Sequence, residues 1–353
     1  MGIMGLQPET GGWERVSLAH AGLDPELGDW LKTGFNKGEF VGLHGVLIAR
    51  RGKLALEHYF DGVDQNWGKP LPSPHHDASL LHDMRSVTKS VIGLLYGIAL
   101  AEDRVPKTIA KIAASFPDHA HLMDERLRKH LTIGHVLSMR MGLEWDEDLP
   151  YSDPLNGEIQ MEASDDRLAF ILGRPMVEAP GSKWRYAGGA SALLGEIITR
   201  GVAQPIDNYA RDRLLVPLGI KDFEWVKGSD GRPSVSSGLR LQPRDMLRVG
   251  QMVLERGNYA GRRIVPPGWL ATSFKPRGYV ESGLRYGYHW WLGQLAATGK
   301  PWIAAYGNGG QRLIVIPSLD MVVAILAGNY NAPDQWKMPL KVMTKVVMPG
   351  VVD

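Results

Sequence analysis

Residues 84–93 read MRSVTKSVIG, and the chain then continues through the apolar run LLYGIALA. Between Ser86 and Ala101 the only charged residue is Lys89. A helix that is apolar on every side is typical of a buried element. A single lysine one turn after a serine therefore needs a chemical explanation, because a buried charge is unfavourable unless it has a partner.

The pair Ser86 and Lys89 has a catalytic interpretation. Residues i and i+3 of a helix share a face. A helix that begins near Met84 places Ser86 in its first turn, where unpaired N–H groups and the helix dipole stabilise an oxyanion. Because burial and the positive helix end both disfavour an ammonium group, we expect the pKa of Lys89 to fall. A neutral lysine can then accept the proton of the serine.

The four-residue pattern is weak evidence by itself. A serine followed three residues later by a lysine occurs about once by chance in a chain of this length, and Lys89 near a helix start could extend to water. Two further segments strengthen the interpretation. WRYAGG (184–189) places Tyr186 at a loop-to-helix junction, and YGNGGQ (306–311) places glycines directly before an apolar strand. Each has a plain structural alternative, a packed tyrosine and a simple turn.

The composition excludes several classes of function. The chain has 353 residues, which suits one large domain or two lobes, and 44% of them are hydrophobic and 22% charged. The formal net charge is +2 and there is no long basic run, so nucleic acid is not an expected partner. The absence of cysteine excludes disulfides, thiol chemistry and zinc–cysteine sites.

The first residues, MGIMGLQPETGGWERVS (1–17), lack the basic start and apolar core of a secretory signal. No apolar stretch reaches the ~18 residues that a membrane helix needs. We therefore expect no membrane contact and, by default, a cytoplasmic protein.

Both ends of the chain predict strand hairpins. Apolar runs flank short polar turns in two places, GVLIA (45–49) with LALEHYF (54–60), and RLIVI (312–316) with MVVAIL (321–326). Residues 23–38 predict an amphipathic helix before the first hairpin, and KVMTKVVM predicts a closing helix after the second.

The middle of the chain predicts helices separated by long loops. Helical spacing occurs in 131–142, 165–173, 191–201 and 244–257, whereas 144–164 and 174–190 are rich in Pro, Gly, Asp and Ser. The pattern predicts an α+β fold, with one antiparallel sheet built from both termini and flanked by helices, plus an all-helical lobe. We assign 15–105 and 235–353 to the sheet lobe and 106–234 to the mainly helical lobe, with the active site between the lobes.

The order of the three motifs resembles that of the penicillin-recognising serine hydrolases, which include class C β-lactamases, D-alanyl-D-alanine peptidases and related esterases. The resemblance runs from about Gly42 to Leu326. Within that family the chain is most similar to 6-aminohexanoate-dimer hydrolases. The segments that carry this likeness are GLEWDEDLPYSDP (142–154), Pro180–Gly195, SGLRLQPRDMLRVG (237–250), YGYHWW (286–291) and GGQ (309–311). The resemblance implies a β-lactamase/transpeptidase-like fold.

The resemblance also implies a mechanism and its residues. Ser86 matches the nucleophile, Lys89 the neighbouring base, and Tyr186 the tyrosine that relays protons. The backbone N–H groups of Ser86 and Gln311 match the oxyanion hole. An acyl-enzyme would form on Ser86 and then be hydrolysed by water. The implied activity is that of a serine hydrolase on carboxylic esters or linear amides, without a cofactor.

Substrate-binding positions follow from the same resemblance. Tyr151 matches a substrate-contacting tyrosine of the aminohexanoate hydrolases. Trp290 or Trp291 would line the pocket, with Trp290 the one we assign, and the other would pack in the core. Asn308 and Gly309 occupy the third motif. The expected partner is a small ester or amide, and the oligomeric state stays open, with a homodimer as one option.

Three positions depart from the family pattern. Gly188 stands where β-lactamases carry an asparagine, and Asn308 stands where a lysine or histidine is usual. The matching place for an asparagine of the aminohexanoate hydrolases falls near Ser236. These changes weaken the alternatives of a β-lactamase or a D-alanyl-D-alanine peptidase. An alternative of another class is a non-catalytic ligand-binding or sensor domain. The presence of Ser86, Lys89 and Tyr186 together favours a hydrolase over this alternative.

Other chemistries have less support. His75, His76, Asp77 and His82 lie in a proline-rich loop but lack a recognised metal-ligand spacing, so we predict no metal site. In the segment HAH (119–121), we expect the two histidines to lie on the solvated surface. The chain contains no G-x-S-x-G segment, so an α/β-hydrolase nucleophile elbow is not expected.

Overall fold

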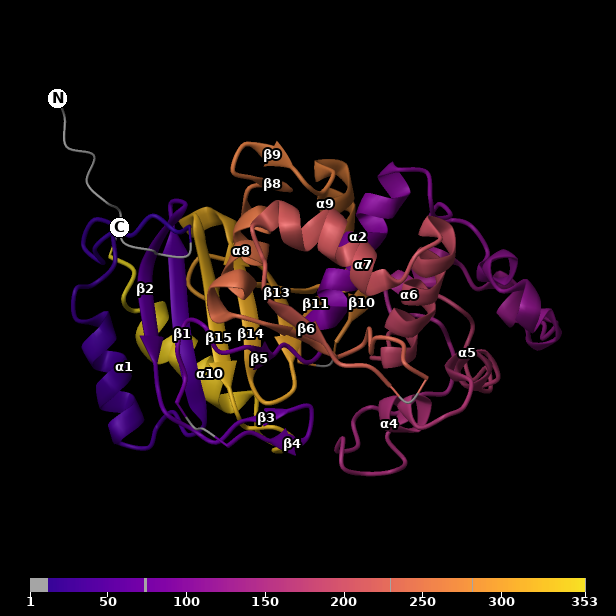
Figure 1. The fold of residues 1–353 in the computed structure, drawn as a ribbon, viewed down its shortest axis with the longest axis horizontal. Helices are drawn as coiled ribbons and strands as arrows, with labels where there is room; N and C mark the ends of the chain where they lie inside the picture. Colours follow the sequence, from indigo (N-terminus) through magenta and orange to yellow (C-terminus); the bar gives the residue numbers. More distant parts are fainter. Residues whose placement is uncertain (1–11, 73–74, 229, 281, 353) are drawn as a thin grey trace.

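The computed structural model describes residues 12–72, 75–228, 230–280 and 282–352. Its centre is an eight-stranded antiparallel sheet with the order β10-β11-β12-β13-β14-β15-β1-β2 (Figure 1). The strands are β1 (Leu43–Arg50), β2 (Lys53–Tyr59), β10 (Gly278–Tyr279), β11 (Arg285–Tyr286), β12 (Trp291–Gln294), β13 (Pro301–Gly307), β14 (Gln311–Ile316) and β15 (Met321–Ala327).

The two ends of the chain meet in this sheet. β1 pairs with β2 on one side and with β15 on the other, in a register that places Val46 opposite Ile325. β14 and β15 form the second hairpin. Both predicted hairpins, and the prediction that the termini share one sheet, are therefore confirmed.

The sheet is buried on both faces. Along β1, Leu47 and Ala49 belong to one hydrophobic cluster, whereas Val46 and Ile48 belong to the other. Because successive side chains of a strand point to opposite faces, the middle of this strand, residues 46–49, must be apolar at every position. That is why its sequence reads as a continuous run rather than as an alternation.

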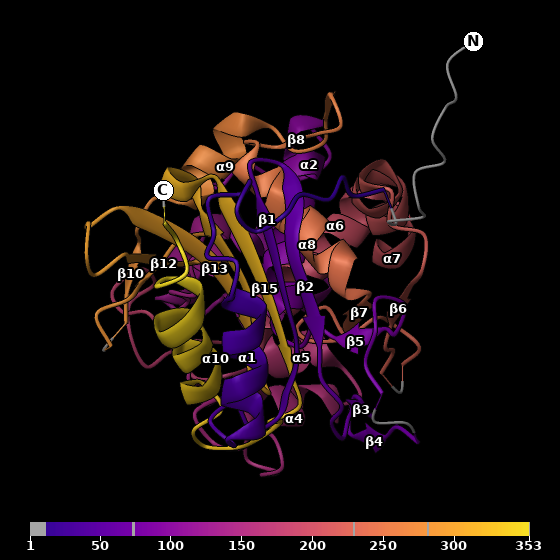
Figure 2. The same cartoon turned by 90° about the vertical axis from the view of Figure 1, so that its left-hand side faces the viewer.

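Helices cover each face of the sheet. α1 (Leu27–Asn36) and α10 (Lys337–Val342), which continues as a π-helix over Met343–Val347, lie against one face (Figure 2). α8 (Pro243–Leu254) packs on the other face, against β14 and β15. The predicted N-terminal and closing helices are both confirmed.

The apolar segment that follows Ser86 forms the central helix. α2 (Val87–Ala101) is buried from Val87 to Ala99 and lies between the sheet and the helices drawn beside it in Figure 1. It packs against β13 on one side and against α6 (Gly188–Val202) on the other. A helix enclosed on all sides needs apolar residues all round, which is the pattern that the sequence has.

The remaining helices are short. They are α3 (Ile133–Leu137), α4 (Gly157–Glu162), α5 (Arg167–Leu172), α7 (Ile206–Ala210) and α9 (Pro267–Ser273). Smaller sheets join β3 (Gln65–Asn66) with β4 (Lys69–Pro70), β5 (His82–Asp83) with β7 (Leu239–Leu241) and β6 (Phe223–Trp225), and β8 (Asn258–Tyr259) with β9 (Arg262–Arg263). The α+β, β-lactamase/transpeptidase-like fold class is confirmed, whereas the residue boundaries of the two lobes stay a prediction.

Two local predictions were wrong. The helix expected over 131–142 ends at Leu137, because Met139 and Gly142 take positive φ values of 54° and 79°. The loop expected over 144–164 contains α4, whose first turn is capped by the Asn156 side chain.

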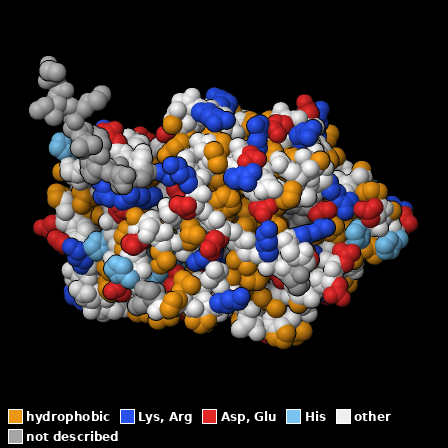
Figure 3. Space-filling view, in the orientation of Figure 1, with side chains coloured by type: hydrophobic (Ala, Val, Ile, Leu, Met, Phe, Trp, Pro, Cys, Tyr) orange, Lys and Arg blue, Asp and Glu red, His pale blue; other side chains and the backbone are white. Residues whose placement is uncertain are grey.

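Charges are intermixed on the surface. Figure 3 shows basic and acidic side chains interspersed over the face that it presents. Nucleic-acid binding calls for a continuous basic surface instead. Within the described ranges, every helix falls short of the length and hydrophobicity that crossing a bilayer requires.

A close contact between α2 and α9 gives a test of the packing. A Cβ added at Gly97 would lie 2.0 Å from Cδ1 of Trp269, whose indole N–H donates to the Gly93 carbonyl at 2.9 Å. Gly97→Ala must displace this buried indole, so we expect the free energy of unfolding to fall by about 1–3 kcal/mol. Urea denaturation measures the change.

The matched control is Gly268→Ala in α9. There an added Cβ meets nothing within 4 Å, and alanine favours a helix over glycine by roughly 0.5–1 kcal/mol. We expect this variant to be as stable as the parent or more stable. Equal unfolding midpoints for the two variants would contradict the packing described.

Candidate active site

Ser86 and Lys89 meet at the start of α2. Ser86 is the residue that precedes the helix, so the helix begins at Val87 rather than near Met84. Lys89 Nζ donates a hydrogen bond to Ser86 Oγ at 3.0 Å, and the two residues are only 1% and 7% exposed respectively. Arg85 has a φ of 48°, an unusual conformation for a residue with a side chain. Backbone strain of this kind concentrates at functional sites.

Tyr186 joins this pair from the loop before α6. Its hydroxyl hydrogen-bonds with Ser86, and Lys89 Nζ lies 5.0 Å from the centroid of its ring. Burial raises the pKa of Tyr186. The structure thus brings together the three residues that the sequence singled out, from two helix starts that are far apart in the chain.

Two carboxylates that the sequence did not single out complete the cluster. Glu158 Oε2 lies 2.8 Å from Lys89 Nζ, and Glu147 Oε2 lies 4.0 Å from it. Both carboxylate side chains are at most 2% exposed. Lys89 also donates to the Ser236 carbonyl at 3.1 Å. The segment 144–164 is rich in acidic residues, and nothing in the sequence separates these two from the solvated ones.

The carboxylates decide the charge of Lys89. Burial alone would lower the pKa of its ammonium group, but the negative charge of Glu158 and the nearby Tyr186 and Glu147 outweigh burial and raise that pKa well above its usual value. The prediction of a lowered pKa was therefore wrong. That prediction was based on the burial of the lysine in an apolar helix. It did not include the two carboxylates that face the lysine in the folded protein.

Glu147 is held by several donors. It accepts hydrogen bonds from Trp145 Nε1 at 2.7 Å, from the Tyr151 hydroxyl at 3.2 Å and from the backbone N–H of Gly188. Burial raises the pKa of the Glu147 carboxyl, and the neighbouring Glu158 adds to this effect. Burial likewise raises the pKa of Tyr151.

Gly188 makes room for both carboxylates. A Cβ at this position would lie 2.5 Å from Glu158 Oε2 and 2.8 Å from Glu147 Oε1. The family pattern has an asparagine here. In this chain carboxylate oxygens occupy the space that a side chain at position 188 would need, so only glycine fits beside the two glutamates.

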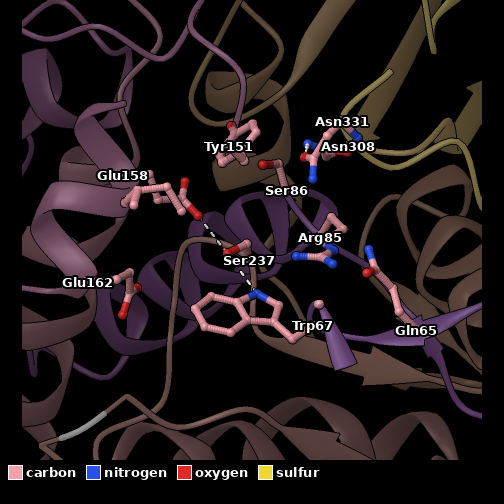
Figure 4. Close-up of a pocket in the computed structure, with 12 residues that line it drawn as sticks. Gln65, Trp67, Arg85, Ser86, Tyr151, Glu158, Glu162, Ser237, Asn308 and Asn331 are labelled. Carbon is pink, nitrogen blue, oxygen red and sulfur yellow. Dashed lines mark hydrogen bonds between the residues drawn. The ribbon is translucent and has the colours of Figure 1, made fainter. Parts of the chain in front are cut away.

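A cavity of about 160 Å³ opens beside Ser86 (Figure 4). Its walls come from the β3–β4 hairpin, from the region of α4 and from the loops beside β13 and β14. The lining residues are Gln65, Trp67, Gly68, Arg85, Ser86, Tyr151, Glu158, Ile159, Glu162, Ser237, Asn308 and Asn331. Two predicted substrate positions, Tyr151 and Asn308, are among them.

Ser237 links two walls of the cavity. Its hydroxyl donates to Glu158 Oε1 at 2.6 Å and accepts from Trp67 Nε1 at 3.4 Å, as Figure 4 shows. Arg85 is a cation on the wall, but it pairs with Asp83 at 3.2 Å. The cavity is therefore apolar on the Trp67 side and acidic around Glu158.

Trp290 does not line the cavity. It is 1% exposed and packs edge-on against Phe274, with ring centroids 5.7 Å apart. Trp291 is the tryptophan near the site, because its ring centroid lies 5.8 Å from that of Tyr186. The assignment of Trp290 was wrong. The sequence alone could not tell which of two adjacent tryptophans faces the site.

The third motif lies beside Ser86. A Cβ at Gly307 would lie 2.4 Å from the Met84 carbonyl oxygen, so only glycine lets the end of β13 come this close. Gln311 begins β14, and its side-chain amide bonds both the N–H and the carbonyl of Ala327. The role of its backbone N–H in an oxyanion hole stays a prediction.

The two substrate positions of this motif differ in orientation. Asn308 faces the cavity with its amide bound to Asn331, where Nδ2 donates to Oδ1 at 2.9 Å. Gly309 has a φ of 89° and donates its N–H to the side chain of Gln335. Gly309 is not among the residues that line the cavity, and its assignment as a substrate contact stays a prediction.

Comparisons with known proteins agree with this architecture. A family model described as Beta-lactamase matches residues 34–335. The chain is 23% identical over 248 residues to esterase EstB of Burkholderia gladioli, a match that covers 67% of the chain and 60% of the esterase. It is 22% identical over 284 residues to the 6-aminohexanoate-dimer hydrolase of Paenarthrobacter ureafaciens, covering 72% of the chain and 67% of that protein. The match with the esterase thus spans less than two thirds of its length.

Solved structures share the fold. EstCE1, a hydrolase with promiscuous acyltransferase activity, superposes with a TM-score of 0.71 at 17% identity, covering 95% of the chain and 98% of EstCE1. A β-lactamase/D-alanine carboxypeptidase from Pseudomonas syringae gives a TM-score of 0.65 at 18% identity, covering 90% and 98%.

The Lys89–Glu158 pair yields a stability prediction. Glu158→Gln removes the closest negative charge from a buried ammonium group, and breaking a buried pair from one side destabilises by roughly 3–5 kcal/mol. We expect the free energy of unfolding to fall by about that amount, measured by chemical denaturation at neutral pH. The control is Glu144→Gln, whose exposed pair with Arg174 should contribute about 0–1 kcal/mol. A Glu158→Gln variant as stable as the control would show that Lys89 is not a buried cation.

Proposed function

The chain belongs to the Beta-lactamase family, and we propose that it is a serine hydrolase that acts on carboxylic esters or linear amides through an acyl-enzyme. The supporting observation is the cluster of Ser86, Lys89 and Tyr186 at one end of the cavity, with Ser86 Oγ and Lys89 Nζ 3.0 Å apart. A serine hydroxyl at a helix N-terminus, within hydrogen-bond reach of a lysine that can exchange protons with a neighbouring carboxylate, is suited to nucleophilic catalysis.

The proton of Ser86 needs an acceptor other than a charged lysine. Transfer of one proton from Lys89 Nζ to Glu158 Oε2, across their 2.8 Å hydrogen bond, converts the ion pair into a neutral amine and a neutral carboxylic acid. The net charge of the cluster is unchanged. The amine then accepts the Ser86 proton as the serine oxygen bonds to the substrate carbonyl. Glu158 thereby supplies the base function that Lys89 lacks in the resting state.

The second half of the reaction uses the same groups. Tyr186, hydrogen-bonded to Ser86, passes a proton to the leaving alcohol or amine. Water then attacks the ester on Ser86 while the cluster accepts its proton. The backbone N–H groups of Ser86 and Gln311 would hold the negative oxygen of each tetrahedral intermediate.

The cavity walls favour esters and flexible amides over β-lactams. Gly188 offers no side-chain amide for the acyl amide of a β-lactam, and Asn308 is already bound to Asn331. Tyr151 and Glu158 both line the cavity and form an acidic corner of it. Such a corner suits the amine end of a linear amide.

Replacement of the nucleophile tests the function directly. Ser86→Ala should abolish hydrolysis of p-nitrophenyl butyrate and labelling by a fluorophosphonate probe, because no other hydroxyl occupies this position. Thermal unfolding should stay close to that of the parent, since the change removes one small polar group. Mass spectrometry of the labelled peptide identifies the site.

Ser182→Ala is the matched control, because Ser182 is exposed on the loop that leads to Tyr186. It should retain full labelling and activity. Retention of both by Ser86→Ala would refute the assignment. A parent that binds acyl compounds but is never labelled would indicate a binding domain instead.

The specificity prediction compares two reporter substrates on one preparation. A change of one methylene in a substrate alters its transition-state binding free energy by ~1–3 kcal/mol, and the loss of a hydrogen-bond partner in the site weakens that binding far more. We therefore expect kcat/KM for p-nitrophenyl acetate or butyrate to exceed that for nitrocefin. A larger value for nitrocefin would restore the β-lactamase interpretation, and cleavage of D-alanyl-D-alanine peptides would restore that of a peptidase.

A further inference from the structure

Three histidines and one aspartate meet in a buried cluster away from the cavity. His44 lies in β1, Asp64 between β2 and β3, His76 in the loop before β5, and His82 in β5. Each residue is at most 5% exposed. One potential ligand atom from each lies within 4.8 Å of all the others. Residues from four separate segments therefore converge on one point.

The cluster differs from the one considered in the sequence. Only His76 and His82 of that loop belong to it. His75 points to the surface and pairs with Asp61 at 2.9 Å, and Asp77 caps the turn that holds Ser79. Sequence spacing could not reveal the set, because His44 and Asp64 come from outside the proline-rich loop.

Contacts inside the cluster are close. His44 Nδ1 lies 2.9 Å from His82 Nε2, and His82 Nε2 lies 3.7 Å from Asp64 Oδ2. The rings of His44 and His76 stack with centroids 3.8 Å apart. Asp64 Oδ2 is one of the buried polar atoms of the described residues that have no hydrogen-bond partner. A buried polar atom in a native protein needs a partner, and a metal ion held by this cluster would supply one.

Contacts around the cluster orient its members. His82 Nδ1 bonds the Asp83 carbonyl at 3.1 Å, and His76 Nε2 bonds the Gly62 carbonyl at 3.0 Å. The Tyr330 hydroxyl donates to Asp64 Oδ1 at 2.9 Å. Each contact occupies one polar atom of a side chain and leaves the other for a ligand. Metal-binding histidines and carboxylates are held by outer partners in this way.

We propose that His44, Asp64, His76 and His82 form a structural zinc site. Three imidazole nitrogens and one carboxylate oxygen are a tetrahedral donor set that zinc prefers, whereas magnesium and calcium prefer oxygen ligands. All four side chains are buried, so no position is open for a substrate, as in structural rather than catalytic zinc sites. Packing alone would explain stacked histidines, but it leaves the buried Asp64 Oδ2 without a hydrogen bond.

The site would fix one wall of the cavity. The segment from Asp64 to Asp83 carries Trp67, which lines the cavity and donates its backbone N–H to Asp83 Oδ2 at 2.7 Å. A metal bound at both ends of this segment, by Asp64 and His82, would tie it to β1 through His44. The proposal is independent of the chemistry at Ser86.

The first test measures metal content. The chain is purified without a histidine tag, stripped with chelator, incubated with zinc chloride, desalted and analysed by elemental mass spectrometry. We expect about one zinc per chain in the parent and in the control His75→Ala, whose side chain lies on the same loop outside the cluster. His76→Ala and His82→Asn should each lose most of the bound zinc. Less than one tenth of a zinc in the parent, or an unchanged content in His76→Ala, would overturn the proposal.

A second test uses the intact parent, so that it does not depend on variants that fold. Cobalt(II) in the stripped protein should give the intense visible bands of tetrahedral coordination, and one equivalent of zinc should abolish them. Zinc should also raise the unfolding temperature of the parent, and chelator should reverse the shift. Weak octahedral bands together with an unfolding temperature that does not respond to zinc would exclude the site.

Discussion

The buried pair of Lys89 and Glu158 is the interaction on which the arrangement of the site depends. Lys89 lies in a helix that is enclosed on all sides, so its charge must find a partner inside the protein. That partner comes from α4, which is thereby held against the start of α2. Gly188 at the start of α6 leaves the space that the carboxylate occupies. The ion pair therefore lies where the N-terminal ends of α2, α4 and α6 meet, and Ser86 is adjacent to it.

The same pair alters the chemistry that the family pattern implies. Where β-lactamases present an amide side chain after the tyrosine, this chain presents two carboxylates in the space above Gly188. The change replaces a neutral hydrogen-bonding group by negative charge. It raises the pKa of Lys89 and makes the cavity acidic around Glu158.

The predictability of each element follows from the range of the forces that form it. The hairpins at β1–β2 and β14–β15 were predictable because both depend on neighbouring residues, namely apolar runs and a short turn. The helix α4 was missed because it has only six residues and depends on the Asn156 cap. The choice between Trp290 and Trp291 was missed because it depends on which side of the chain faces Tyr186.

The sequence by itself determined that the two termini build one sheet, and that Lys89 lies one turn after Ser86 in an apolar helix. Only the tertiary structure decided the charge of that lysine and the meeting of His44, Asp64, His76 and His82. The physical reason is distance: electrostatic and coordination chemistry act over a few ångströms, and Glu158 reaches 2.8 Å from Lys89 although 69 positions separate them in the chain. Local patterns cannot report which distant side chains will share a buried space.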